Sequence, residues 1–544
     1  MEPLFYKTDL TQSIYQAPKT MKPVVHVVWF KHDLRVHDHA ALSEACKLGA
    51  VLPIFTWQAE VWGGADYATQ HQCFVSECLH SLQLQLKTIG LSLLASSIGI
   101  LETLAKIAQT NTIASLHSHE ETGNDNTYQL DKAVAIWCNT HAIPWHEYPQ
   151  NGVVRRLKSR DKWAALWEQR MTAPLIPVPE HVSQAAWLLA DRPNMYTQPL
   201  TLLQADKPQR QRGGREEAIK LLHTFLHGRA SRYRGGISSP LSSECAGSRI
   251  SPYLTWGVLS MREVVQALRL QRATIQAHPD SYPKGLLAGL AGFESRLHWH
   301  CHFMQKLESE PRIEFENLHP AFNALRDESY TSAESQTRLQ AWQTGQTGWP
   351  LVDACMAMLR ETGWVNFRMR AMLMSTASYL LWLHWRQTGL HLAREFLDYE
   401  PGIHWSQVQM QSGTTGINTL RIYNPVKQAI DQDPDGVFVR RWLPALRQVS
   451  NSWIFQPWLM PEALQQACGC KIGVDYPAPL VDIEQAYKLA KARFSQLKKS
   501  PQHYAQTANI IHKHASRKPN SDRQRQRKQK PTAEQLAARQ QSLF

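Results

Sequence analysis

A polar stretch from Tyr399 to Gln428 holds residue types that could bind or transform a ligand. It reads YEPGIHWSQVQMQSGTTGINTLRIYNPVKQ and mixes amides, hydroxyls and His404 with large apolar side chains. Its polar side chains are too many for ordinary core, and its Ile, Trp and Tyr residues are too many for an exposed linker. Asp398 and Glu400 stand at its start. We interpret the stretch as the wall of a pocket for a large planar heterocycle, either a flavin or another heteroaromatic ligand.

Three arginines lie in the apolar, helix-patterned segment GWPLVDACMAMLRETGWVNFRMRAML. They are Arg360, Arg368 and Arg370. Buried arginines need anionic partners, and the two carboxylates of the polar stretch follow soon after. A surface salt bridge is the alternative interpretation, which the apolar surroundings disfavour.

The motif AGSRISPYLTWGVLS, from Ala246 to Ser260, is a candidate phosphate site. Small and hydroxyl residues precede a helix with Pro252 near its start, so backbone N–H groups, Ser248 and Arg249 could bind a phosphate. Every capped helix shares this signal. Together with the arginines and the polar stretch, however, it indicates one pocket for a phosphate-bearing heterocycle.

The segment HWHCH places three histidines and a cysteine together, from His298 to His302. On a helix only His298 and His302 share a face, and one such pair is a poor metal site without further ligands. We therefore expect no metal there. The nine cysteines include no C-x-x-C pair, which is typical of reduced thiols in a cytosolic protein.

Strand and helix signals alternate over the first 150 residues. Five short apolar runs have the pattern of strands, at residues 24–30, 51–57, 91–96, 113–118 and 143–149. This alternation predicts a doubly wound α/β domain with a parallel sheet. The lack of a G-x-G-x-x-G motif argues against Rossmann-type dinucleotide binding. From residue 213 onward helical spacing prevails, which predicts a large all-α domain.

These signals divide the chain into five parts. They are an N-terminal extension (1–22), the α/β domain (23–150), an irregular connector (151–212), the all-α domain (213–498) and a basic tail (499–544). The tail is rich in charge and poor in apolar residues, so we expect it to be disordered.

The chain of 544 residues carries a net charge of +13. The last 32 residues hold nine Lys or Arg and two Asp or Glu, hence +7, and the other 512 residues carry +6. This balance suits a polyanionic partner such as nucleic acid, or it only aids solubility. The longest apolar run, from Ala371 to Leu383, has thirteen residues, fewer than the ~20 that span a bilayer. We expect a cytoplasmic, monomeric protein without membrane contact.

Four segments between Val24 and Leu446 resemble the DNA photolyase/cryptochrome family. They are WFKHDLRVHDHAAL, GSRISPYLTWGVLS, GWPLVDACMAMLRETGW and RIYNPVKQAIDQDPDGVFVRRWLPAL, in this order. The resemblance implies an α/β domain that can hold an antenna chromophore of the pterin/folate or deazaflavin type, followed by an all-α FAD-binding domain. In photolyases, photoexcited reduced FAD donates an electron to a UV-induced pyrimidine lesion that is flipped out of the DNA.

The resemblance also implies roles for single residues. Cofactor contacts fall on Tyr233, Gly247, Ser248, Arg249, Ile250, Ser251, Arg370, Asp398, Glu400, His404 and Asn424. Catalytic positions at the lesion fall on Glu294, Trp299, His300, Trp364 and Asn366. DNA contacts fall on Arg368, Arg421 and Arg441.

Two departures from the family pattern concern the flavin and the lesion. His404 stands where photolyases usually have Asn, so it could give a proton to the flavin or only a hydrogen bond. Asn366 and Phe367 replace a usual His–Asn pair.

The tryptophan relay of the family is incomplete. Trp385 matches its middle member, but the proximal position is Val408 and the distal one falls near Ser332. Trp405 and Trp382 either form another electron-transfer route with Trp385 or are only core aromatics. No four-cysteine set of the iron–sulfur branch is present.

The expected function is light-dependent repair of UV-damaged DNA by a photolyase, a carbon–carbon lyase. The alternative is a cryptochrome-like blue-light photoreceptor that binds FAD without repair, which the departures favour, whereas Arg368 and the basic tail favour DNA binding. A flavoprotein that only binds nucleic acid is a third interpretation. The lesion, a cyclobutane dimer or a (6-4) product, is left open. Glu120 or Glu121 could hydrogen-bond a pterin antenna, or could belong to a solvated loop.

Overall fold

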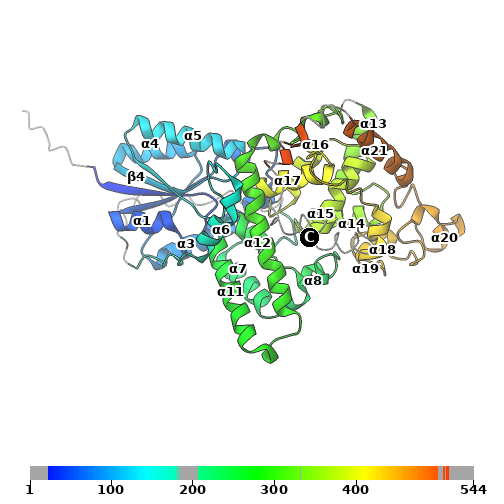
Figure 1. The fold of residues 1–544 in the computed structure, drawn as a ribbon, viewed down its shortest axis with the longest axis horizontal. Coiled ribbons are helices and arrows are strands. Elements are labelled where there is room, and N and C mark those ends of the chain that lie inside the picture. Colours follow the sequence, from blue (N-terminus) through cyan, green and yellow to red (C-terminus); the bar gives the residue numbers. More distant parts are fainter. Residues whose placement is uncertain are drawn as a thin grey trace, which may run out of the picture.

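The computed structural model describes residues 22–180, 182, 206–330, 332–499, 506–508, 510, 511 and 513. The expected N-terminal extension, apart from its last residue, and most of the basic tail lie outside the described residues. Figure 1 shows a part built around a sheet at one end of the molecule and a larger helical part beside it.

The N-terminal part contains five parallel strands in the order β3-β2-β1-β4-β5. Helices cover both faces of the sheet, so the predicted doubly wound α/β fold is confirmed (Figure 1). The strands are β1 (Val24–Phe30), β2 (Val51–Thr56), β3 (Leu94–Ser96), β4 (Thr112–His119) and β5 (Trp145–Tyr148). The helices are α1 (Ala40–Leu48), α2 (Ala59–Trp62), α3 (Thr69–Thr88), α4 (Ile100–Thr110) and α5 (Asp125–Thr140).

Alternate side chains of β1 point to opposite faces of the sheet. Val25, Val27 and Trp29 pack in the core beneath α4 and α5. Val28 and Phe30 point the other way and join a core that continues into the helical part, as the two-residue period of a strand requires. The sheet is thereby packed against the helical part, in a core that reaches Leu397 and Tyr399 at the start of the polar stretch.

The connector is less irregular than expected. Residues Arg160–Lys162 form a 3₁₀ turn and α6 spans Trp163–Thr172. Trp163, Trp167 and Met171 of α6 are buried, so a face of apolar side chains folds this segment onto the helical part. Residues 183–205 lie outside the described residues.

The remaining described chain is helical, and its one β feature is an isolated bridge between Ile472 and Tyr476. The predicted all-α second part is therefore confirmed. Its helices are α7 (Arg215–His227), α8 (Tyr233–Gly236), α9 (Ser243–Ala246), α10 (Ser251–Thr255), α11 (Met261–Ala277), α12 (Leu286–Ser309), α13 (Ala333–Thr344), α14 (Pro350–Thr362), α15 (Phe367–Ser375), α16 (Trp385–Glu395), α17 (Pro401–Ser412), α18 (Pro425–Gln432), α19 (Val437–Trp442), α20 (Glu462–Ala467) and α21 (Ile483–Lys498). Within the described residues no helix is long and apolar enough to cross a membrane.

Part of the basic tail is ordered against the helical part, contrary to the expectation of a wholly disordered tail. The described residues between 506 and 513 are helical. The side chain of Lys513 pairs with Glu310, and the backbone carbonyl of Lys513 accepts a hydrogen bond of 2.7 Å from Arg160. The hydroxyl of Thr507 lies 3.2 Å from Nε2 of His319. Ile510 joins the apolar core, and the Ile510–Ile511 pair is the signal that the overall composition of the tail concealed.

Candidate functional site

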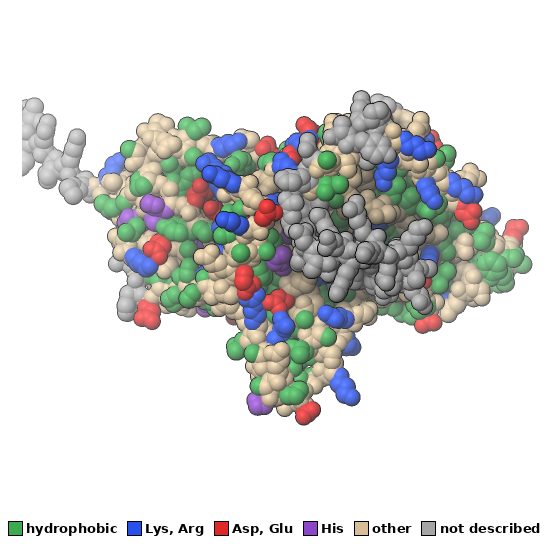
Figure 2. Space-filling model, in the orientation of Figure 1, with side chains coloured by type: hydrophobic (Ala, Val, Ile, Leu, Met, Phe, Trp, Pro, Cys, Tyr) green, Lys and Arg blue, Asp and Glu red, His purple; other side chains and the backbone are tan. Residues whose placement is uncertain are grey.

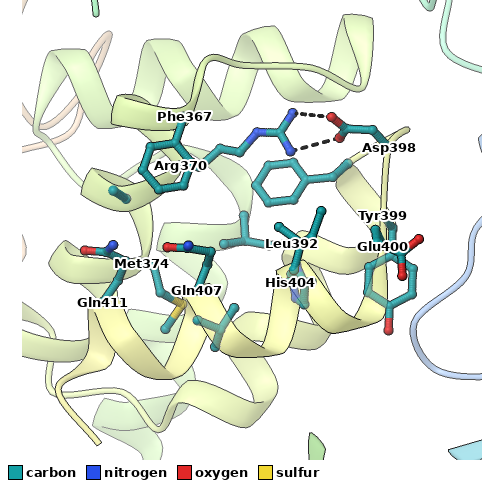
Figure 3. A pocket seen from close by; sticks show the side chains of 14 residues that line it. Phe367, Arg370, Met374, Leu392, Asp398, Tyr399, Glu400, His404, Gln407 and Gln411 are labelled. Atoms are coloured by element: carbon teal, nitrogen blue, oxygen red, sulfur yellow. Dashed lines mark hydrogen bonds and ion pairs between the residues drawn. The ribbon is translucent and has the colours of Figure 1, made fainter. Parts of the chain in front are cut away.

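A pocket lies between α15 and α17, and the first residues of the polar stretch form part of its wall (Figure 3). It encloses about 520 Å³ when its open mouth is included. Its lining residues are Phe367, Arg370, Ala371, Met374, Leu392, Phe396, Asp398, Tyr399, Glu400, Ile403, His404, Gln407, Val408 and Gln411. Four of the predicted cofactor contacts, Arg370, Asp398, Glu400 and His404, are thereby brought together on one wall.

Arg370 and Asp398 form a bidentate ion pair at this pocket. Nη1 lies 2.8 Å from Oδ1 and Nη2 lies 3.1 Å from Oδ2, while Nε donates to the Val365 carbonyl. Burial alone would raise the pKa of Asp398, but the charge and hydrogen bonds of Arg370 outweigh burial and hold this pKa below its usual value. Asp398 is therefore ionised at neutral pH, as the predicted pairing requires.

Glu400 is in the opposite protonation state, although it lies only two residues from Asp398. It is 5% exposed, and burial followed by the negative charge of Glu121 raises its pKa to about 8. Its Oε1 atom has no hydrogen-bond partner among the described residues. Glu400 therefore presents a neutral carboxyl group, which can donate or accept a hydrogen bond.

His404 is a neutral imidazole with a defined tautomer. Nε2 lies 2.9 Å from the carbonyl oxygen of Gly389, and burial lowers the pKa of His404 to about 3. Because a carbonyl can only accept, Nε2 carries the proton and Nδ1 is left as an acceptor. Of the two roles expected for His404, the geometry favours a hydrogen bond over proton donation.

The candidate phosphate motif lies next to the ion pair. Ser251 hydrogen-bonds Asp398, which joins the start of α10 to the pocket wall. Arg249 has a positive φ of 62° and its guanidinium stacks 3.7 Å from the ring centroid of Trp364. The residues expected here, Gly247, Ser248 and Ile250, belong to the same turn.

Three other predicted contacts have structural partners of their own. The side chain of Asn424 accepts from the N–H groups of Val426 and Lys427 and so caps α18. Asn366 donates to the carbonyls of Ile237 and Ser238, at 3.0 and 2.8 Å. Tyr233 is buried and packs against Phe225 and Phe293.

The candidate lesion residues of α12 separate in space. Glu294 is bound by Arg269, at 2.8 Å, and by Arg272, so its carboxylate faces α11 and does not line the pocket. Trp299 packs on His302, with ring centroids 4.9 Å apart. His300 lines a second cavity, which it shares with Glu400. Spacing on the chain could not reveal which face of α12 meets the pocket.

The histidines of the HWHCH segment do not converge. His298 packs on the rings of Trp163 and Trp167, whereas Nδ1 and Nε2 of His302 both lie 3.3 Å from Arg160. His298 and His302 both pack on Trp163 and so share one face of α12, whereas His300 lines the second cavity.

A different group, Asp33, His39 and His119, brings three ligand atoms within 4.8 Å of one another. His39 Nδ1 accepts from the Leu42 N–H, so its Nε2 carries a proton and lies 3.1 Å from Asp33 Oδ2. His119 Nδ1 lies 2.7 Å from the same oxygen. A metal ligand nitrogen must be unprotonated, so a hydrogen-bonded His–Asp–His network accounts for this group.

Two of the three candidate electron-transfer tryptophans are neighbours. The rings of Trp385 and Trp405 are 5.8 Å apart, both are fully buried, and Trp405 lies 4.9 Å from His404. Trp382 instead packs between Arg326 and Arg493, at 4.8 and 4.3 Å. The pocket thus has a two-ring aromatic path behind it.

The predicted DNA contacts differ in their surroundings. Arg441 is half exposed and pairs with Glu244 at 3.0 Å. The charges of Arg368 and Arg421 both act on Tyr423, so these two arginines lie near one another. On the face drawn in Figure 2, Lys and Arg side chains are spread over both parts of the molecule and alternate with Asp and Glu.

Glu121 is not in a solvated loop. It is buried, accepts from the N–H groups of Thr122 and Gly123, and lies 3.8 Å from Lys31. Lys31 also binds Asp131 at 3.1 Å. These partners already satisfy the carboxylate that was a candidate for a pterin contact.

Sequence reasoning missed the amides of α17. Gln407 and Gln411 line the pocket, and neither amide atom of the buried Gln411 has a partner among the described residues. Their spacing of four residues, which puts both on one face of a helix, was the available signal.

Two family models match the chain. Residues 26–162 match a model described as DNA photolyase, and residues 293–496 match the FAD binding domain of DNA photolyase. The deoxyribodipyrimidine photo-lyase of Streptomyces griseus is 28% identical over 500 residues, which cover 87% of this chain and 98% of that protein. Cryptochrome-2 of Arabidopsis thaliana is 24% identical over 513 residues, which cover 87% of this chain and 79% of that protein.

Solved structures show the same fold. A Synechocystis cryptochrome has a TM-score of 0.74 at 22% identity, over 87% of this chain and 99% of that one. A class III photolyase from Agrobacterium tumefaciens has a TM-score of 0.72 at 23% identity, over 90% of this chain and all of that one. The two family models, which together match residues 26–162 and 293–496, show that the chain belongs to the DNA photolyase/cryptochrome family.

Proposed function

We propose that this protein is a light-dependent DNA photolyase that binds FAD and splits UV-induced pyrimidine dimers. The observation that carries the proposal is the pocket between α15 and α17, which lies inside the match to the FAD binding domain of DNA photolyase. It combines the Arg370–Asp398 ion pair with a neutral carboxyl group and a neutral imidazole.

The residues of the pocket fit a flavin. Buried polar atoms of Glu400, Gln407 and Gln411 have no partner among the described residues, and leaving such atoms unpaired costs about 1–3 kcal/mol each. A flavin ring would offer hydrogen-bond donors and acceptors to these atoms. Its planar face would pack against the apolar wall. When bound, FAD would supply the light-driven electron. The protein would orient it through Arg370 and Asp398 and exclude water with the side chains of α15 and α17.

The mouth of the pocket suits a flipped base. Phe367 lines the pocket and is 40% exposed. We propose that a flipped base stacks on this ring, a contact that contributes about 1–3 kcal/mol. Arg368 follows it directly on α15 and would bind the backbone phosphates that flank the lesion.

A cryptochrome-like photoreceptor is the second candidate. His404 and the incomplete tryptophan relay, with Val408 at its proximal position, favour it. The Trp385–Trp405 pair behind His404 is then the aromatic path that could deliver electrons to a flavin. Cryptochromes also stand among the relatives.

An antenna chromophore in the α/β part belongs to the same proposal. The archaeal photolyase from Sulfolobus tokodaii holds two FAD molecules, which imply a novel light-harvesting cofactor in that protein. Because Glu121 is already paired with Lys31, we propose that any antenna of this chain contacts other groups near the carboxyl ends of β1 and β4.

The test is light-driven repair. The purified protein is checked for flavin by absorbance, reduced, and illuminated with two oligonucleotides, one with a cyclobutane dimer and one with a (6-4) product. Loss of one lesion only under blue light establishes a photolyase and identifies its substrate. Repair of neither lesion by the reduced, flavin-loaded protein refutes the repair function and leaves the photoreceptor.

A further inference from the structure

A second cavity lies where the α/β part meets the helical part. It encloses about 370 Å³ including its opening. Its lining residues are His32, Arg35, Thr122, Gln150, Asn151, Leu254, Thr255, Gly257, Leu259, Ser260, Met261, His300, Met304 and Glu400. Glu400 also lines the flavin pocket, so this one side chain borders both cavities.

Two buried polar atoms at this cavity have no hydrogen-bond partner among the described residues. They are Oε1 of Glu400 and Nδ1 of His300. The two residues are held together by close packing of α17 on α12, because a Cβ at Gly402 would lie 2.6 Å from the Cα of Met304. Buried polar atoms of this kind are normally satisfied by ordered water where the cavity is polar and roomy enough.

We propose that Glu400 stores a proton for the flavin pocket and exchanges it with water in the second cavity, along a route lined by His300. The proposal rests on FAD binding in the proposed function. Thr122, Gln150 and Asn151, which are partly exposed, mark the end of the route that meets solvent.

The charges around Glu400 are consistent with a stored proton. On the pocket side it faces the paired Arg370 and Asp398, whose charges offset each other, and the neutral His404. On the cavity side it faces the neutral His300, and also His32 and Arg35. Arg35 is turned to the carbonyls of His37, Asp38 and Gly257, and Glu121 adds negative charge. None of these groups is an unengaged cation that would stabilise the carboxylate, so the neutral acid is favoured.

The proton transfer needs a chemical reductant as its one added reactant. When a chemical reductant delivers electrons to the loaded pocket, the O–H bond of Glu400 would break and its proton would form an N–H bond on the reduced flavin ring, which offsets the added negative charge. A water molecule of the second cavity then gives Glu400 a new proton, and the cavity regains one from solvent. His404 cannot supply this proton, because its only N–H is directed to the Gly389 carbonyl.

The first test detects the stored proton directly. Infrared spectra of the wild-type protein at pH 7 are expected to contain a protonated carboxyl band that is lost in Glu400→Gln and that titrates between pH 7 and 9. A spectrum in which no such band depends on Glu400 overturns the proposal. The band is measured with and without bound flavin. A protein that fails to bind FAD would refute the proposed function, but its spectrum would still show whether Glu400 is protonated.

The second test follows the route. Proton uptake from the buffer is recorded with a pH-indicator dye while reduced methyl viologen, whose oxidation releases no proton, reduces the flavin-loaded protein. We expect Glu400→Gln and His300→Phe to slow uptake at least about tenfold, since a positioned proton donor contributes roughly 10²–10⁴-fold. His298→Phe is the matched control, because His298 lies on the same helix but packs on Trp163 and Trp167, and it should leave the rate unchanged. Unchanged uptake in Glu400→Gln, or equal slowing by His298→Phe, overturns the route.

Discussion

Replacing Glu400 with Gln should change how the stability of the protein depends on pH. In the folded protein the pKa of Glu400 is raised to about 8 from the ordinary value of 4.5. Such a group contributes stability that is fully present below pH 4.5 and is lost as the pH rises to about 8. Glutamine keeps the size and the neutral state of the protonated acid, so the variant should not show this loss.

The size of the effect follows from the two pKa values. They differ by about 3.5, and each unit corresponds to about 1.4 kcal/mol, so the upper limit is about 5 kcal/mol. Relaxation and water penetration lower this limit, and we expect about 2–5 kcal/mol. At pH 5 the variant and the wild type should be similarly stable, whereas at pH 8.5 the variant should be more stable.

Urea unfolding followed by tryptophan fluorescence measures this difference, because most tryptophans of the helical part are buried. Urea unfolding curves of both proteins are recorded at pH 5, 7 and 8.5. The contributions of all other titrating groups cancel in the difference between the two free energies of unfolding. Parallel stability curves across this range would show that Glu400 is ionised in the folded protein and would refute the reasoning.

Three further predictions concern the pocket and its mouth. Asp398→Asn should destabilise the protein by about 3–5 kcal/mol and release FAD, because the charge of Arg370 is left buried without its partner; wild-type urea midpoints and flavin content would contradict this. Trp405→Phe should slow photoreduction of bound flavin, whereas Trp382→Phe should not, as absorbance under blue light can show; equal rates in both would dismiss the aromatic path. Arg368→Ala should weaken binding to damaged DNA and lower the salt slope by about one while FAD content is unchanged, and unaltered affinity in a titration would remove Arg368 from the DNA surface.

The sheet could be predicted from the sequence because its signals are local. Each strand is a short apolar run that ends in a polar turn, and each observed strand falls within or near its predicted range. The all-α part was equally visible from helical spacing. The error in the connector arose because α6 has only ten residues and lies within a longer segment rich in Pro, Arg and polar residues, whose overall composition resembles a loop.

The site could be predicted only in part. The residues that were placed wrongly depend on helix packing, which the sequence does not show. The resemblance to the family placed Arg370, Asp398, Glu400 and His404 at the cofactor, and the structure brings these four residues together in one pocket. Glu294 could not be assigned correctly, because only the packing of α12 on α11 shows that it faces Arg269. The same holds for protonation states, which depend on burial and on partners distant in the chain.

Asp398 and Glu400 show how far such surroundings can separate two similar groups. Both carboxyl groups line one pocket, and both are buried. Arg370 grips Asp398 with two hydrogen bonds and keeps it ionised, whereas Glu400 receives one backbone N–H, from Gly402, and stays protonated. A pair of carboxyl groups whose pKa values are pushed apart can divide two tasks, with the anion fixing a ligand and the acid holding a proton. Because the ion pair is neutral as a whole, loss of the Glu400 proton is the change that would alter the charge of the pocket near neutral pH.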